Sequence, residues 1–182
     1  MHPDLSTLEA GLDEIRRAPQ DEGKIELIVR WPADNERETL TEARLDVAAG
    51  LVGDVWQSED GDTLHQVTVM NARAADLLAG SRERWPLAGD QLYVDLDLSH
   101  RNLPPGTHIE VGSAVLEVTT EPHRGCKKFG ARFGLDALRF VNSGTGCALN
   151  LRGVNTRVVR SGVVRPGDAI RKLPATMPGP GA

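Results

Sequence analysis

Residues 107–120 read THIEVGSAVLEVTT, and this stretch decides the fold class. Its two halves, 107–111 and 114–120, are rich in the β-branched and apolar residues that favour strands. The segment Val111-Gly-Ser-Ala114 between them has the small, Gly-containing composition of a tight turn. The stretch therefore predicts two antiparallel strands joined by a hairpin.

Further strands are expected on both sides of this hairpin, with turn signals between them. The candidates are residues 24–31, 66–70, 91–96, 156–160 and 168–173. Many short strands without a regular alternation of strands and helices predict an antiparallel sheet curled into a barrel rather than a doubly wound sheet. The fold class is therefore mainly β.

Helices are expected in three places only. Leucine and isoleucine recur at helical spacing between residues 5 and 15, with Asp4 placed to cap one N-terminal helix. A second helix is expected over 72–79 with Asn71 as its cap, and a third helical region over 126–141. The segment Asn142-Ser-Gly-Thr-Gly146 lacks the Lys and the third Gly of phosphate-binding loops, so it is interpreted as an ordinary loop.

The composition indicates one globular domain. The chain has 182 residues, 40% of them hydrophobic and 26% charged, which suffices for a core without disulfides or a structural metal. We assign residues 1–173 to a single domain and expect the Pro/Gly-rich tail 174–182 to be disordered. The sequence has neither an apolar run of membrane-spanning length nor a signal-peptide pattern, so a cytoplasmic location is expected.

The charges are unevenly distributed along the chain. Residues 1–99 carry nine Lys/Arg and 21 Asp/Glu, whereas residues 100–182 carry twelve and five. An anionic ligand is therefore expected to meet the second half, unless the two halves mix in space. The sequence pI of about 5.5 argues against general nucleic-acid binding.

Cys126 is the candidate reactive residue. It follows a predicted strand in the segment 121–134, EPHRGCKKFGARFG, and no carboxylate occurs from residue 122 to 135. The fixed cations in that segment are Arg124, Lys127, Lys128 and Arg132. They favour the thiolate over the thiol, as would His123 if protonated. The alternative is a buried structural cysteine, which is the interpretation adopted for Cys147.

Arg124, Lys127 and Arg132 also offer donors for a phosphate group, with a solvated basic surface as the alternative, above all for Lys128. The five histidines show no metal-ligand spacing. Among them only His123, three residues before Cys126, is a candidate for the site.

These motifs resemble those of a MOSC domain, the molybdenum cofactor sulfurase C-terminal domain. The resemblance rests on Glu121-Pro-His-Arg-Gly-Cys126, on residues 151–162 (LRGVNTRVVRSG) and on residues 165–173 (RPGDAIRKL), and covers about 45–173. It implies a MOSC-type β-barrel of mixed strands in which Cys126 ligates molybdenum of the molybdopterin cofactor, or carries sulfur for it. Arg124, Lys127, Lys128 and Arg132 would hold the cofactor, and His123 would tune the thiolate or donate a proton.

The sequence departs from the family pattern in two respects. Val55 and Trp56 follow Gly53-Asp54 where the family commonly has a basic residue and His. The 182 residues contain no stretch that we assign to a pyridoxal-phosphate desulfurase domain, so we do not expect pyridoxal phosphate as a cofactor. A separate electron or sulfur donor protein would then be needed.

Three functions remain open at this point. The first is a molybdenum-dependent oxidoreductase that reduces a small molecule of the N-hydroxylated class. The second is a carrier that passes a Cys126 persulfide or the cofactor to a client. The third is a barrel that binds a small anion or a partner protein without chemistry. Neither nucleic acid nor a membrane is expected as a partner, and the sequence leaves the oligomeric state open.

Overall fold

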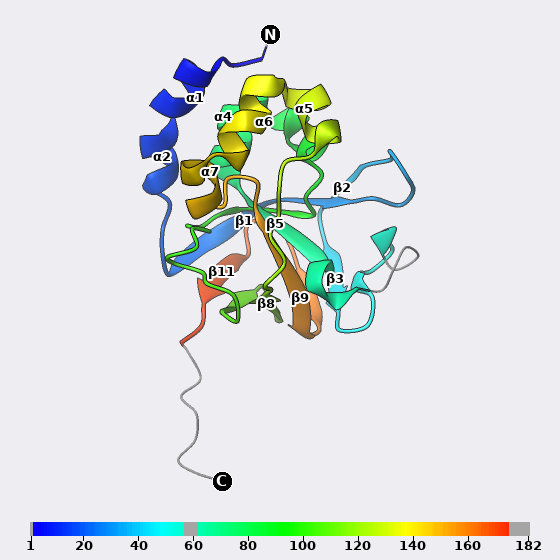
Figure 1. The fold of residues 1–182 in the computed structure, drawn as a ribbon. Coiled ribbons are helices and arrows are strands. Elements are labelled where there is room, and N and C mark those ends of the chain that lie inside the picture. Colours follow the sequence, from blue (N-terminus) through cyan, green and yellow to red (C-terminus); the bar gives the residue numbers. More distant parts are fainter. Residues whose placement is uncertain (1, 57–61, 175–182) are drawn as a thin grey trace.

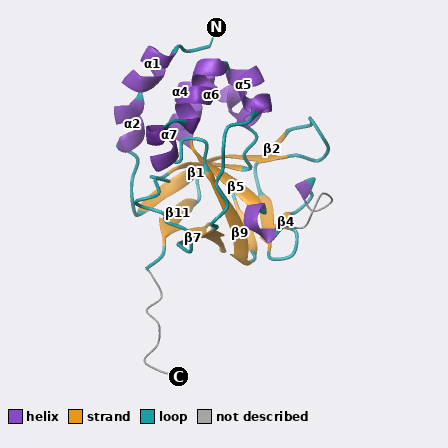
Figure 2. Ribbon diagram, in the orientation of Figure 1, coloured by secondary structure: helices purple, strands orange, loops and turns teal. Residues whose placement is uncertain are grey.

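A barrel of mixed strands, covered at one end by short helices, forms the protein (Figures 1 and 2). The computed structural model describes residues 2–56 and 62–174. Strands run in the order β11-β7-β8-β9-β5-β6-β1-β2, and β11 also pairs with β1, which closes seven of them into a barrel. These eight strands are β1 (Glu22–Arg30), β2 (Glu38–Leu40), β5 (Val67–Asn71), β6 (Leu92–Asp95), β7 (His108–Val111), β8 (Ala114–Val118), β9 (Val154–Arg160) and β11 (Ala169–Lys172).

All seven strands expected from the sequence are confirmed, with bounds that differ by up to two residues. The hairpin is confirmed too, because Val111 of β7 pairs with Ala114 of β8. One pairing, between β5 and β6, is parallel, so the barrel has the mixed strands that the resemblance implied, whereas the strand pattern alone predicted an antiparallel sheet. The helix α4 (Ala72–Ala79) lies between these two strands in the chain and provides the crossover that parallel pairing requires.

Short strands that the sequence pattern did not indicate form a second sheet. Its order is β10 (Gly162–Val164), β3 (Ala43–Asp46) and β4 (Gly50–Leu51), all antiparallel. Two to four residues are too few to show a periodicity in the sequence.

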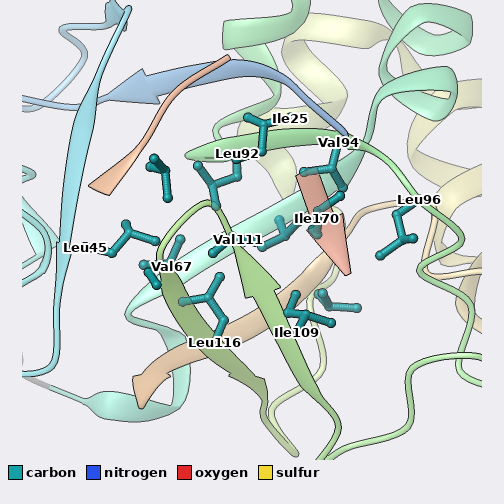
Figure 3. Packing of buried hydrophobic residues seen from close by; sticks show 14 of the residues in the cluster. Ile25, Leu45, Val67, Leu92, Val94, Leu96, Ile109, Val111, Leu116 and Ile170 are labelled. Atoms are coloured by element: carbon teal, nitrogen blue, oxygen red, sulfur yellow. The ribbon is translucent and has the colours of Figure 1, made fainter. Parts of the chain in front are cut away.

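The helical layer explains why several strands are buried on both faces. It contains α1 (Leu5–Ala10), α2 (Leu12–Arg16), α4, α5 (Lys127–Phe133), α6 (Leu135–Asn142) and α7 (Gly144–Ala148), with the 3₁₀ turns η1 (Thr63–His65) and η2 (Arg82–Ala88) elsewhere in the chain. Along β6, Leu92 and Val94 join the core inside the barrel, whereas Tyr93 joins the core under the helices. Figure 3 shows the inner cluster. Alternate residues of one strand thus stabilise both layers.

The expected helix caps are confirmed, but the extent of the N-terminal helix and the interpretation of residues 142–146 differ from the prediction. Asp4 accepts a hydrogen bond from Thr7 N, and Asn71 accepts one from Ala74 N. The N-terminal helix is divided at Gly11, whose missing side chain leaves room for Leu77 of α4. The prediction of an ordinary loop at 142–146 was wrong, because α6 ends at Asn142 and Ser143 caps α7.

Parts of the chain lie outside this description. Residues 175–182, which include most of the expected tail, are not among the described residues. Within the described part, no helix has both the length and the apolar character needed to cross a bilayer.

Candidate functional site

Cys126 is exposed at the end of the loop that leads from β8 into α5. Phe129 and Phe133 anchor this helix in the outer core, with their ring centroids 4.8 Å apart. The loop is fixed on α6 by a reciprocal pair, in which Gly125 N donates to Asn142 Oδ1 (2.9 Å) and Asn142 Nδ2 donates to Gly125 O (3.0 Å). The thiol is therefore presented to solvent on a fixed backbone.

The surroundings of Cys126 lower the pKa of its thiol. Partial burial acts in the opposite direction, but it is outweighed by backbone N–H groups of Phe129 and Lys128 and by the charge of Arg152. Hydrogen bonds and positive charges stabilise the thiolate, which is the nucleophilic and metal-binding form.

A buried charge cluster lies next to this loop. Asp90 is fully buried, and Arg152 donates to its carboxylate through Nη1 (2.5 Å) and to Ala88 O through Nη2 (2.8 Å). His123 Nε2 lies 3.3 Å from the other oxygen of Asp90. Burial raises the pKa of Asp90, but Arg152 and His123 outweigh it and lower the pKa, so the carboxylate stays ionised.

His123 is predominantly a neutral ring at neutral pH, because burial, reinforced by the charge of Arg152, lowers its pKa below the usual 6.5. Its side chain is only 16% exposed and contacts Asp90. This contact was not predictable from the sequence, because Asp90 precedes His123 by a long stretch of chain and follows Gly89 in what has the composition of a turn.

Positive charges without a carboxylate partner gather around α5. Most arginines of the second half form ion pairs, several of them with acids of the first half, as Arg171 does with Glu22 and Arg165 with Glu42. Six cations near α5 form no ion pair within residues 2–56 and 62–174, and we call them the α5 cations. They are Arg37, Arg84, Arg124, Lys127, Lys128 and Arg132.

The α5 cations do not all face the same way. Lys127 and Lys128 are exposed on the first turn of the helix, whereas Arg132 donates to Leu87 O (3.0 Å) from the last turn. The guanidinium of Arg124 contacts the thiol of Cys147. The four cations expected to hold a cofactor therefore do not form one cluster, since Arg124 lies at Cys147 and Arg132 lies near Trp31.

The surroundings of Arg132 include two residues that were not among the sequence candidates, Trp31 and Arg37. Arg37 Cζ lies 4.3 Å from the ring centroid of Trp31, and Arg132 Cζ lies 5.9 Å from the same ring. Burial and the charge of Arg132 lower the pKa of Arg37. Both guanidiniums contact the same indole, and neither has a carboxylate partner in the described residues. An anion bound here would relieve the repulsion between the two positive charges.

A pocket of about 180 Å³ adjoins Trp31 and includes the two positions that depart from the family pattern. Its lining consists of Trp31, Asp54, Val55, Trp56, Gly89 and Gln91. Asp54 accepts hydrogen bonds from the backbone N–H groups of Trp31 (2.9 Å) and Trp56 (3.1 Å). Trp56 is only 8% exposed, so a buried indole occupies the position where the family commonly has His.

A second pocket, of about 240 Å³, is lined by residues 118–124, at the end of β8 and in the loop after it, and by residues of α7. It is lined by His123, Arg124 and the half-buried Cys147, but not by Cys126. Cys147 donates weakly to Asn142 O (3.5 Å) and contacts Arg124. The residue interpreted as structural thus also forms part of a pocket wall.

A family model for the MOSC domain matches residues 80–171, which includes Asp90, His123, Cys126 and Arg152. This chain belongs to the MOSC domain family. The resemblance noted from the sequence is thereby confirmed, and so is the mainly β MOSC fold. A MOSC domain is often a molybdenum-cofactor-binding domain, which supports a general cofactor-binding role here.

Solved structures share the MOSC fold at low sequence identity. YuaD from Bacillus subtilis is 17% identical with a TM-score of 0.56, covering 82% of this chain and 94% of its own. YiiM from Escherichia coli is 19% identical with a TM-score of 0.56, covering 84% and 71%. A crystal structure described as a hypothetical protein has 19% identity and a TM-score of 0.61, covering 86% and 69%. At these identities the likeness shows the fold alone.

A curated relative matches a shorter part of the MOSC chain. Gamma-glutamyl phosphate reductase from Thermus thermophilus is 36% identical over 81 residues, in each of two strains. That stretch is 44% of this chain and 18% of the relative. The chain thus spans less than a fifth of that protein's length, so the match does not show that the two proteins share an activity.

Proposed function

We propose that this protein binds the molybdenum cofactor with Cys126 as the molybdenum ligand and reduces N-hydroxylated or related small molecules. The observation that carries the proposal is the exposed Cys126 thiol of lowered pKa, set among cations that lack a carboxylate partner in the described residues. A soft thiolate suits molybdenum, and unpaired cations suit a phosphate group.

The residues present fit such a group. The Nε of Arg152 and the Nη2 of Arg37 are buried with no hydrogen-bond partner in the described residues, as are the indole N–H groups of Trp31 and Trp56. Unsatisfied donors of this kind are costly and call for an explanation. No three His, Cys, Asp or Glu side chains of the described chain gather as a metal site, so a metal would rely on Cys126 and the pterin.

Each residue then has a definite task. The bound cofactor would supply the redox chemistry through its molybdenum. Cys126 would be the molybdenum ligand, and the hydrogen bonds between Gly125 and Asn142 would keep its backbone in position. Arg132, Arg37, Lys127 and Lys128 would hold the phosphate end. Arg152 would favour the thiolate of Cys126 while Asp90 keeps this arginine in place.

His123 would take part in a proton step only indirectly. Its neutral ring contacts Asp90, and it is not a residue with a proton to give readily at neutral pH. We therefore assign the proton for a departing oxygen to solvent, and assign His123 the role of holding Asp90.

The exposure of Cys126 favours a second candidate, a carrier of sulfur or cofactor. A thiol that another protein must reach has to be exposed, and Cys126 is. In this role a Cys126 persulfide would pass its terminal sulfur to a client, and the same cations would hold the client's cofactor phosphate.

The test is molybdenum content by elemental mass spectrometry, with pterin fluorescence after oxidative release, on protein made in a cofactor-competent host. We expect near-stoichiometric molybdenum in the wild type and in Cys147→Ser, and a loss of at least tenfold in Cys126→Ser. Arg37→Ala and Arg132→Ala should lower pterin retention. Arg101→Ala should not, because Arg101 also lacks an ion pair in the described residues but belongs to another pocket.

The outcomes separate the candidates. Molybdenum retained in Cys126→Ser would contradict the proposal. No metal or pterin in any variant, together with a persulfide on Cys126 in mass spectra of the intact protein, would favour the carrier.

A further inference from the structure

The 240 Å³ pocket beside Cys147 has no task in the proposed cofactor site. It opens between the loop after β8, the residues around α7 and the start of β9. Its apolar wall consists of buried side chains, namely Leu103, Val118, Val141 and Val154. Its polar residues include the exposed His100, Thr120, Glu121 and Arg124. The pocket therefore offers an apolar wall and a polar rim, as small-molecule sites do.

Two opposite fixed charges belong to this rim. Among the described residues that line the pocket, only Glu121 and Arg124 carry a fixed charge. Neither side chain forms an ion pair within residues 2–56 and 62–174, and they do not pair with each other. Within the described part of the chain, the Arg124 side chain hydrogen-bonds to the thiol of Cys147 and to no carboxylate. Both charges are thus available to a ligand.

The size of the pocket limits the ligand. A volume of about 240 Å³ is below the roughly 300–1,000 Å³ of pockets for drug-sized molecules. A ligand with one charge would leave the opposite charge of the rim without a partner. A small molecule with both charges and an aliphatic part complements the whole pocket.

We infer that this pocket binds a small zwitterion with an apolar side chain, of the α-amino-acid class. The carboxylate pairs with Arg124, the ammonium pairs with Glu121, and the side chain packs on the apolar wall. Charge-assisted hydrogen bonds fix the head group, and the apolar wall selects the side chain. This site does not depend on the molybdenum cofactor, so either proposal can fail without the other.

The test is isothermal titration of the metal-free protein with leucine, valine and methionine as probes. The comparison compounds are 4-methylpentanoate and 3-methylbutylamine, which keep the aliphatic part of leucine but carry one charge each. We expect one site per chain for at least one amino acid. Each single-charge analogue should bind at least about tenfold more weakly, which corresponds to about 1.4 kcal/mol.

Variants locate the binding site. Glu121→Gln and Arg124→Gln should each weaken amino-acid binding at least tenfold, whereas Arg139→Gln, an exposed arginine on α6, should leave it unchanged. Both rim residues are exposed, and circular dichroism verifies that the variants fold. Equal binding of 4-methylpentanoate and leucine would overturn the inference in favour of a simple anion site. No binding of any amino acid, or full binding by Glu121→Gln, would also overturn it.

Discussion

Arg152 and Asp90, 62 residues apart in the chain, form an ion pair that is buried beside the loop of Cys126. Removing one partner of a buried pair leaves an uncompensated charge in the core. We therefore expect Arg152→Met and Asp90→Asn each to lower the free energy of unfolding by about 3–5 kcal/mol, measured by urea denaturation.

The double variant Asp90→Asn/Arg152→Met should lose less than the sum of the two, because it leaves no lone charge. The exposed pair of Arg171 and Glu22 provides the comparison, and Arg171→Met should cost much less than Arg152→Met, because solvent screens an exposed ion pair. Equal losses for Arg152→Met and Arg171→Met would contradict the role assigned to the buried pair.

His123 makes stability depend on pH. Its folded-state pKa is lowered, so the unfolded chain binds more protons as the pH falls, and stability is lost on acidification. The contribution is fully present above the unfolded value of about 6.5 and is lost as the pH falls below it. Urea denaturation at pH 7.5 and 5.5 should show a larger loss for the wild type than for His123→Gln.

The exposed His100 provides the control for this measurement. His100→Gln should keep the pH dependence of the wild type. A slope that is the same in His123→Gln and the wild type would show that another group titrates instead.

The thiol of Cys126 should react at a lower pH than an ordinary cysteine. In a Cys147→Ser background, the rate of alkylation by iodoacetamide should rise with an apparent pKa below that of the same thiol in the urea-unfolded chain. Since backbone N–H groups of α5 contribute most of the favourable shift, a large part of it should persist in 1 M salt, where surface charges are screened. An apparent pKa that is no lower in the folded protein than in the unfolded chain would contradict both proposed uses of this thiol.

Two glycines with positive φ should differ in their tolerance of alanine. A Cβ at Gly153 (φ +106°) would lie 2.5 Å from Val69 O, whereas one at Gly80 (φ +71°) would meet no atom within 4 Å. We expect Gly80→Ala to cost about 1–2 kcal/mol, from backbone strain alone. Gly153→Ala should cost at least about 3 kcal/mol, and similar losses for both would show that the contact relaxes freely.

Local signals made much of the fold predictable from sequence. The β7–β8 hairpin, the helix capped by Asn71 and the position of Cys126 directly before α5 each depend on residues within a few positions of one another. The resemblance implied mixed strands, but that β5 and β6 form the parallel pair was not predictable, because strand periodicity carries no information about a strand's neighbour.

The same limit applies to the site. Trp31 and Arg37 reach Arg132 only because β1 and the following loop fold back towards α5. No helix or strand periodicity in the sequence indicates that Trp31 and Arg37 lie near Arg132. The charge imbalance between the two halves was visible in the sequence. Its outcome was not, because first-half acids pair with second-half arginines, and among the described residues cations without an ion pair remain around α5 and at Arg101.

The pairing of β1 with β11 also has a consequence for folding. Glu22 and Arg171 face each other across the seam of the barrel, so the ring cannot close until nearly all of the residues between them have been synthesised. Contacts this distant in sequence slow folding. During synthesis, β1 would expose a strand edge rich in isoleucine and valine that could pair with other nascent chains. This seam is where we expect misfolding during translation to begin.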